Sequence, residues 1–134
     1  FYPKKFEIVA ISINHGFDFF NKEFLEETCK KIDVPLFIED TNIKEIVFDV
    51  REEKNPCSLC ANFRRGALNS VAIREGCNKI ALGHNEDDVL ETFLLNLLYT
   101  GTINTFASVS FMDRTQITLI IPFKFACSSF IFNN

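Results

Sequence analysis

Short apolar runs alternate with longer stretches of helical periodicity along the chain. The apolar runs are rich in β-branched residues and end at turn-forming residues, which is typical of strands. The other stretches repeat apolar positions every three or four residues, which is typical of amphipathic helices. This pattern predicts strands over residues 6–13, 36–39, 79–82 and 117–121, and helices over 21–32, 58–75 and 85–101. Residues 43–50 fit either a strand or a helix.

Polar residues and glycines mark the ends of the predicted helices. Ser58 is suited to cap the second helix, whereas Gly76 and Gly101 are suited to end the second and the third. Cys29 and Cys77 fall in helical or helix-ending patterns and are interpreted as small buried apolar residues. The residues predicted to face inward are Phe24, Leu25, Thr28 and Ile32 in the first helix, and Val89, Leu90, Phe93, Leu94, Leu97 and Leu98 in the third.

The alternation of strands and helices predicts an α/β layered fold with a mostly parallel sheet and right-handed crossovers. Ligands of such sheets bind beyond the carboxyl ends of the strands. The two loops that matter most are therefore residues 14–16, after the first strand, and residues 83–88, after the third. His15, in the first loop, is interpreted as a surface or hydrogen-bonded histidine.

Composition narrows the class of protein. The chain has 134 residues, of which 47% are hydrophobic and 24% charged, so it suits one globular domain and is neither disordered nor collagen-like. The net charge of −4 gives no global reason to bind nucleic acid, and no apolar run reaches the roughly 20 residues of a membrane span. Five scattered cysteines favour a reduced, cytoplasmic chain over a disulfide scaffold. The chain begins with Phe1, so residues preceding it are expected.

The loop over residues 83–88 carries the densest chemistry. Gly83 would let a ligand approach the backbone, and His84 and Asn85 follow at the start of a helix. Asp87 and Asp88 can hold Mg²⁺, which prefers carboxylate and phosphate oxygens. The alternative is structural: Asn85 caps the helix, and the acidic residues complement its dipole.

A second feature is the Cys57-Ser58-Leu59-Cys60 segment, followed by Arg64 and Arg65. Two cysteines in this spacing at a helix start suit redox chemistry or a soft metal, and Cys127 could supply a third thiolate for an iron–sulfur cluster. The alternative is a pair of thiols without a ligand. The two arginines suit phosphate groups of ATP or RNA, or else form a solvated basic face.

These two motifs together resemble the N-type ATP pyrophosphatase (PP-loop) superfamily, and within it the tRNA 2-thiocytidine and 2-thiouridine synthetases. The resemblance runs from about Phe6 to Pro122 and is most specific over residues 57–66 and 81–92. It implies a three-layer, Rossmann-like fold of the adenine-nucleotide alpha-hydrolase type. It also implies that ATP and Mg²⁺ adenylate a carbonyl oxygen of a tRNA base, which sulfur then replaces.

The resemblance also assigns roles to residues. Cys57 and Cys60 match paired ligands of a [4Fe-4S] cluster, with Cys127 as the candidate third ligand. Arg64 matches the basic residue after the pair and is a candidate catalytic residue together with Asp88. The candidate nucleotide-binding residues are Ile13, Gly83, His84, Asp87 and Asp88. The alternatives are an inactive metal- or RNA-binding remnant and a cluster-free enzyme of the tRNA lysidine synthetase type.

The chain departs from the family at three places. The Ser-Gly-Gly-x-Asp-Ser phosphate loop and its strand do not occur in it, and the C-terminal helix of the family is also missing. Residues 1–134 are therefore expected to form a partial single domain that binds ATP weakly or not at all and is inactive alone. The family's third cysteine falls four residues after a proline, where this chain has Ala126 and then Cys127. The tail over residues 130–134 matches nothing in the family. The sulfur donor, the modified base and the formation of a homodimer stay open.

Overall fold

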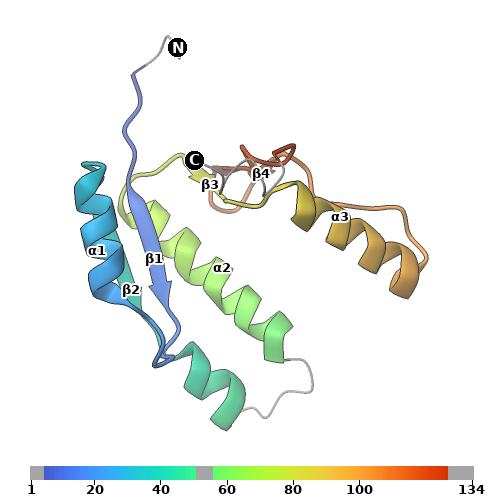
Figure 1. Ribbon diagram of the computed structural model, residues 1–134, viewed down its shortest axis with the longest axis horizontal. Coiled ribbons are helices and arrows are strands. Elements are labelled where there is room, and N and C mark those ends of the chain that lie inside the picture. The colour runs from blue at the N-terminus through green and yellow to red at the C-terminus, as the bar shows by residue number, and fades with distance from the viewer. Residues whose placement is uncertain (1–4, 51–55, 127–134) are drawn as a thin grey trace. The chain divides into compact units, whose positions relative to one another are not determined.

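The computed structural model describes residues 5–50 and 56–126, and the chain divides into two compact units, Phe1–Glu75 and Gly76–Asn134 (Figure 1). The elements of the first unit are β1 (Ala10–Asn14), α1 (Lys22–Lys31), β2 (Leu36–Asp40), the π-helical η1 (Glu45–Val50) and α2 (Pro56–Arg74). Those of the second are β3 (Lys79–Ala81), α3 (Glu86–Leu95), the π-helical η2 (Asn96–Thr100), β4 (Val109–Met112) and β5 (Ile117–Ile120).

Both units pair their strands in parallel, which confirms the predicted α/β class. In the first unit β1 lies parallel to β2, in a register that runs from Ala10 opposite Leu36 to Asn14 opposite Asp40. In the second unit β3 lies parallel to β5, and β4 is added antiparallel on the other side of β5. None of the helices in the described part of the chain combines the length and apolar character that a membrane span requires.

The first strand is shorter than predicted. The sequence favoured a buried strand from Phe6, but β1 starts at Ala10, and Phe6 and Ile8 are exposed. The reason lies in the partner strand: the Ala10 amide donates to the Pro35 carbonyl at 2.8 Å, and β2 starts only at Leu36. Residues 5–9, the described residues before Ala10, therefore lie outside the register that pairs β1 with β2.

The core of the first unit is built by β1, α2 and the segment that leads into η1. Ile13, Ile43, Val47 and Val71 are buried together. The ambiguous residues 43–50 are helical, which is why Ile43 and Val47, four positions apart, face the same core. Half-buried residues of α2 complete the cluster; they are Leu59, Cys60, Phe63, Ala67 and Leu68.

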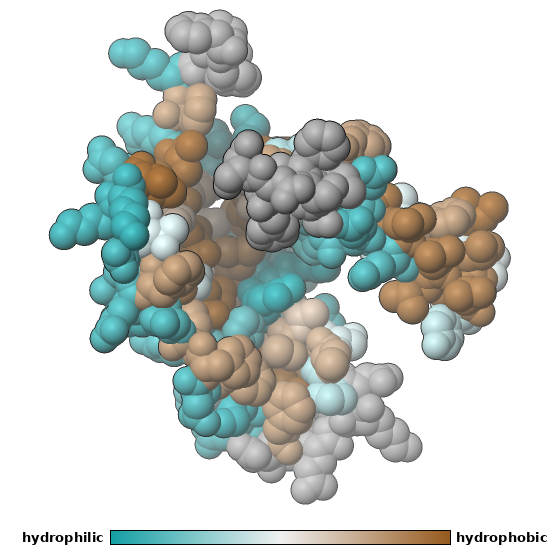
Figure 2. Space-filling view, viewed as in Figure 1, coloured by the Kyte–Doolittle hydropathy of each residue, from teal (hydrophilic) through white to brown (hydrophobic). Residues whose placement is uncertain are grey.

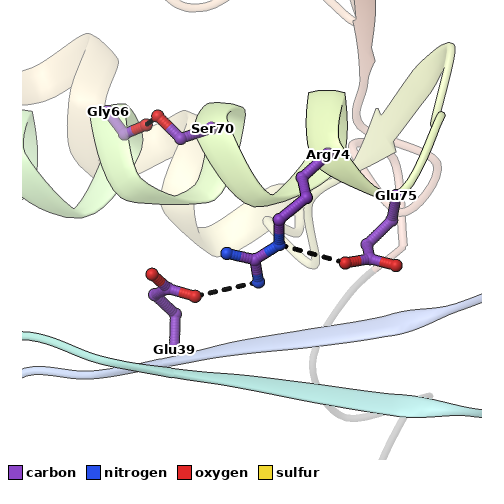
Figure 3. Close-up of polar contacts among 5 residues, drawn as sticks. All are labelled: Glu39, Gly66, Ser70, Arg74 and Glu75. Atoms are coloured by element: carbon purple, nitrogen blue, oxygen red, sulfur yellow. Dashed lines mark hydrogen bonds and ion pairs between the residues drawn. The ribbon is translucent and has the colours of Figure 1, made fainter.

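A proline begins α2, and a glycine lies just beyond its end. The helix begins at Pro56 rather than behind a Ser58 cap, because proline has the backbone φ of a helix and needs no amide donor in the first turn. Gly76 just beyond the helix adopts a φ of +70°, as predicted for a glycine that ends a helix. Near this end Arg74 donates to Glu39 of β2 at 2.9 Å and to Glu75 at 3.1 Å (Figure 3).

The inward face of α1 differs from the predicted stripe. Asn21 caps the helix by accepting from the Phe24 amide at 2.9 Å, but the Phe24 ring and Ile32 are largely exposed. The half-buried positions are Leu25 and Cys29, which are four residues apart. The interpretation of Cys29 as a small packing residue is consistent with this half-buried position.

Two features of the second unit were not predicted correctly from the sequence. β4 was not predicted, although Val109 and Phe111 alternate with Ser108 and Ser110; the strand has only four residues, and three of them are exposed. The leucines predicted to face inward from α3 are largely exposed at Leu90, Leu94, Leu97 and Leu98. Hydrophobic residues therefore gather over α3 and η2 in the space-filling view (Figure 2).

One asparagine ties the loop after β1 to the loop after β2. The Asn14 side chain donates to Asp40 at 2.8 Å and accepts from the Gly16 amide at 3.0 Å. Its carbonyl oxygen accepts from both the amide and the hydroxyl of Thr41, at 2.9 and 2.8 Å. Gly16 has a φ of +86°, and a Cβ there would lie 3.4 Å from the Thr41 carbonyl oxygen, so this turn suits glycine.

Replacing Asn14 tests this tie between the two loops. Asn14→Ala removes two side-chain hydrogen bonds and is expected to lower the free energy of unfolding by about 1–2 kcal/mol. Urea unfolding followed by circular dichroism measures the loss. Asn62→Ala, on the exposed side of α2, is the matched control and is expected to be neutral or slightly stabilising, since alanine favours helix. If both variants have the same free energy of unfolding, Asn14 does not stabilise the contact between the two loops.

Candidate functional site

A hollow opens at the carboxyl edge of the β1–β2 pair, where the fold class places ligands. It has a volume of about 260 Å³ and is lined by His15, Gly16, Thr41, Asn42, Lys44 and Glu45. The parallel register brings the two loops together here, and the Lys44 amide donates to the His15 carbonyl at 2.9 Å. The loop after the first strand, selected from sequence, therefore borders a real concavity.

His15 is not a plain surface histidine. Partial burial lowers its pKa below the usual 6.5, and the positive charge of Arg64 lowers the pKa further. The neutral imidazole is thus favoured, and it can accept a hydrogen bond from a ligand near neutral pH. This effect also shows that the Arg64 guanidinium acts on the same edge of the unit as His15.

The cysteine pair lies in the first turns of α2. Cys57 is exposed and Cys60 is half-buried against the core, and both are free thiols. Positions 57, 60 and 64 are three and four residues apart, so Arg64 shares their helix face. Arg65 lies about 100° round the helix. Arg65 therefore falls outside the helix face that positions 57, 60 and 64 share.

The cysteines fit part of a metal centre. Cysteine thiolates are soft ligands that suit zinc or an iron–sulfur cluster. Among residues 5–50 and 56–126, no three His, Cys, Asp or Glu side chains gather as a metal site. Cys127, the candidate third ligand, lies outside the described residues. The pair can therefore contribute two ligands of a cluster.

In the second unit, the acidic loop forms a capping box at the start of α3. The Asn85 side chain accepts from the Asp88 amide at 3.1 Å, and the Asp88 carboxylate accepts from the Asn85 amide at 2.9 Å. The predicted cap at Asn85 is confirmed. Asp88, a candidate for catalysis and nucleotide binding, thus has a structural task as well.

The neighbours of the capping box differ in how far they reach into solvent. Asp87 is exposed in the first turn, and Asp88 beside it is half-buried. Gly83 is exposed, and no described atom lies within 4 Å of the position that a Cβ would take. Adjacent helix positions point in different directions, so Asp87 and Asp88 do not form a ready two-carboxylate cage for Mg²⁺.

His84 lies just before the capping box and has an unsatisfied atom. Its ring centroid lies 5.3 Å from that of Phe106, and its buried Nδ1 has no hydrogen-bond partner among the described residues. The buried Thr105 hydroxyl oxygen is in the same condition. Nearby, the Lys124 ammonium donates to the Phe106 carbonyl at 2.8 Å. His84 Nδ1 is therefore an atom at which a ligand or a water can make a hydrogen bond.

Ile13, the remaining candidate, is buried in the core of the first unit. Its side chain packs against Ile43, Val47 and Val71, so it would meet a nucleotide only through its backbone. The loop that contains Asn14 was selected from the sequence, but Asn14 itself was given no role, and Lys44 was not selected; the importance of both comes from the pairing of β1 with β2. A polar residue at the end of an apolar run was the available signal for Asn14.

The coupling of His15 to Arg64 can be measured by NMR titration of the two histidines, with His84→Gln to assign the signals. Arg64→Gln is expected to raise the pKa of His15 part of the way to 6.5, since burial remains. Arg65→Gln is the control and is expected to leave the pKa of His15 unchanged. An equal rise of that pKa in both variants would refute a specific effect of Arg64 on His15. Because the folded chain binds this proton more weakly, stability is full above about pH 6.5 and falls below it.

Comparisons with known proteins place the chain in a family. It is 34% identical over 125 residues to a tRNA-cytidine(32) 2-sulfurtransferase of Pelobacter propionicus, covering 92% of this chain and 46% of that protein. It is 36% identical over 124 residues to the same enzyme of Geobacter sulfurreducens, covering 90% and 47%. The chain spans about half the length of the curated relatives it matches.

The fold is shared with a solved structure. The U34-tRNA thiolase NcsA from Methanococcus maripaludis, determined with its [4Fe-4S] cluster, matches with a TM-score of 0.67 and 24% identity. The match covers 92% of this chain and 43% of that one, which confirms the Rossmann-like α/β fold. The PP-loop domain family matches residues 2–125, and the chain therefore belongs to the PP-loop family.

Proposed function

We propose that this chain carries part of an ATP-dependent enzyme that thiolates a base of tRNA in the cytoplasm. A carbonyl oxygen of the base would attack the α-phosphorus of ATP with release of pyrophosphate, and sulfur would then displace AMP. The observation that carries the proposal is the 34–36% identity to tRNA-cytidine(32) 2-sulfurtransferases over about nine-tenths of the chain. Membership of the PP-loop family supports the use of ATP.

In this proposal the start of α2 handles sulfur. Cys57 and Cys60 hold two positions of an iron–sulfur cluster, and Cys127 is the candidate for a third. When bound, such a cluster supplies an iron with an open position for sulfide or substrate. The cluster reported for the U34-tRNA thiolase supports this assignment. Arg64, on the same helix face, would bind phosphate oxygens of the nucleotide or of the RNA backbone.

The start of α3 would meet the nucleotide. Gly83 leaves open space beside the backbone, and the unsatisfied Nδ1 of His84 can make a hydrogen bond with a ligand. Asp87 is the exposed carboxylate that could hold Mg²⁺ through retained water molecules. Asp88 would orient this loop through the capping box and add negative charge close to the metal. A sulfur donor completes the reaction.

The cysteine assignment is tested by iron and sulfide content after anaerobic reconstitution. Cys57→Ser is expected to lose most of the bound iron, because serine is a poor ligand for a soft metal. Cys57 is exposed, so this variant keeps the core intact. Cys77→Ser is the control outside α2 and is expected to keep the iron. If Cys57→Ser binds as much iron as the parent chain, the cysteine pair is not a ligand of the cluster.

The two tasks of Asp88 can be separated by paired variants. Asp88→Asn keeps an oxygen that can accept from the Asn85 amide, so the free energy of unfolding is expected to change by less than about 0.5 kcal/mol. Asp88→Ala loses that bond and is expected to cost about 1 kcal/mol. If the charge serves catalysis, both variants lose thiolated nucleoside, measured by mass spectrometry of digested tRNA. Full activity of Asp88→Asn would leave Asp88 with capping alone.

A further inference from the structure

An aromatic and cationic cluster stands beside the hollow of the first unit. Phe17 and Phe19 are stacked, with ring centroids 5.2 Å apart and planes inclined by 15°. Phe48 meets Phe17 edge-on at 6.1 Å, and the Lys44 ammonium lies 5.7 Å from the centre of the Phe17 ring. We call these four residues the Phe17–Phe19 platform. Its residues come from the loop after β1 and from the helical segment after β2.

The platform is open on one side. Phe19 is 83% exposed, whereas Phe17 beneath it is half-buried and fixed by contacts with its neighbours. Single exposed apolar residues are ordinary on protein surfaces. A stacked pair with one open ring face is different, because a further flat ring can continue the stack without any rearrangement of the protein.

Lys44 gives the platform a cation beside its stacked rings, which suits an anionic group better than a second apolar surface. Lys44 lies over Phe17, and the centroid of the His15 ring is 6.4 Å from that of Phe17. The Arg64 charge reaches His15, as the lowered pKa shows. Two acidic residues act in the opposite direction. Glu45 lines the hollow, Asp18 lies between Phe17 and Phe19 in the chain, and both carboxylates repel an anion. Within α2 the charged residues are Arg64, Arg65 and Arg74, with no acid.

We propose that the Phe17–Phe19 platform binds an unpaired nucleobase of RNA, stacked on the open face of Phe19, with the adjoining phosphate held by Lys44. Single-stranded RNA is recognised by stacking of its splayed bases on aromatic side chains, with cations along the backbone. The proposal deepens the proposed function, since it rests on tRNA as substrate and names the surface that contacts its unpaired bases.

The chain offers a clean optical test because it contains no tryptophan. Phe19→Trp places a single fluorophore on the platform while keeping an aromatic ring for stacking. Its emission is expected to be quenched by a single-stranded RNA oligonucleotide and by tRNA, and far less by a fully paired RNA duplex at equal phosphate concentration. A blue shift that depends on protein concentration and not on RNA would mean docking of a second copy, and would overturn the proposal.

Affinity measurements supply the second arm. Base stacking on an aromatic residue contributes enough that Phe19→Ala is expected to weaken binding of the oligonucleotide by about five- to 150-fold. Phe19→Leu, which keeps apolar area but loses the ring, is expected to lose as much as Phe19→Ala. Lys44→Gln is expected to weaken binding and to reduce its dependence on salt.

Phe125 is the matched control. It is also 83% exposed and lies under a lysine, with the Lys124 ammonium 5.7 Å from its ring centre, but it belongs to the other unit. Phe125→Ala is expected to leave RNA affinity unchanged, and Phe125→Trp to remain unquenched. Equal losses for Phe19→Ala and Phe125→Ala would overturn the assignment to the platform.

The outcome separates this proposal from the proposed function. If the parent chain forms thiolated nucleoside and Phe19→Ala has an unchanged KM for tRNA, the platform is refuted while thiolation stands. If Phe19→Trp is quenched by single-stranded RNA but Cys57→Ser keeps as much iron as the parent, the cluster assignment in the proposed function is refuted while the platform stands.

Discussion

The parallel pairing of β1 with β2 is the constraint on which the first unit depends. Parallel strands end at the same edge, so the loops that follow them must meet there. Asn14 fixes this meeting with four hydrogen bonds: its side chain bonds Asp40 and Gly16, and its carbonyl oxygen accepts twice from Thr41. The hollow beside His15 and the position of Lys44 both follow from that register.

The helical repeat of α2 separates residues that pack in the core from residues that remain exposed for a ligand. Cys60, Phe63, Ala67 and Val71 recur at spacings of three and four and face the core. The same spacing puts Cys57 and Arg64 at the margin of that face, where a thiol and a guanidinium remain exposed. Cys60 therefore packs against the core and is still partly exposed, so a metal bound there would be held by a residue that the core positions.

Local rules in the sequence predicted the strands, the helices and the cap at Asn85, because proline, glycine and capping residues act over a few positions. The features that were not predicted depend on pairing between strands that are distant in the sequence. The start of β1 depends on where β2 begins, and β4 exists because β5 offers it a partner. Phe24 was expected inside because it is apolar, yet its ring is exposed, whereas Leu25, which was also expected inside, and Cys29 are half-buried in the helix that packs against β2. The catalytic assignments came from the family resemblance, since residue types alone left Asp88 equally suited to capping.

Two lysines near phenylalanine rings show why one surface suits a ligand and the other suits stability. Lys124 lies over Phe106 and Phe125, and its ammonium already donates to the Phe106 carbonyl at 2.8 Å, which joins residue 124 to the backbone at residue 106. Lys44 lies over Phe17 and borders a hollow of about 260 Å³ instead. A cation committed to a backbone carbonyl gains little from a phosphate, because it would have to exchange one charge-assisted bond for another. A cation beside a solvent-filled hollow loses only water, so the surface around Lys44 is the better place for an anionic substrate.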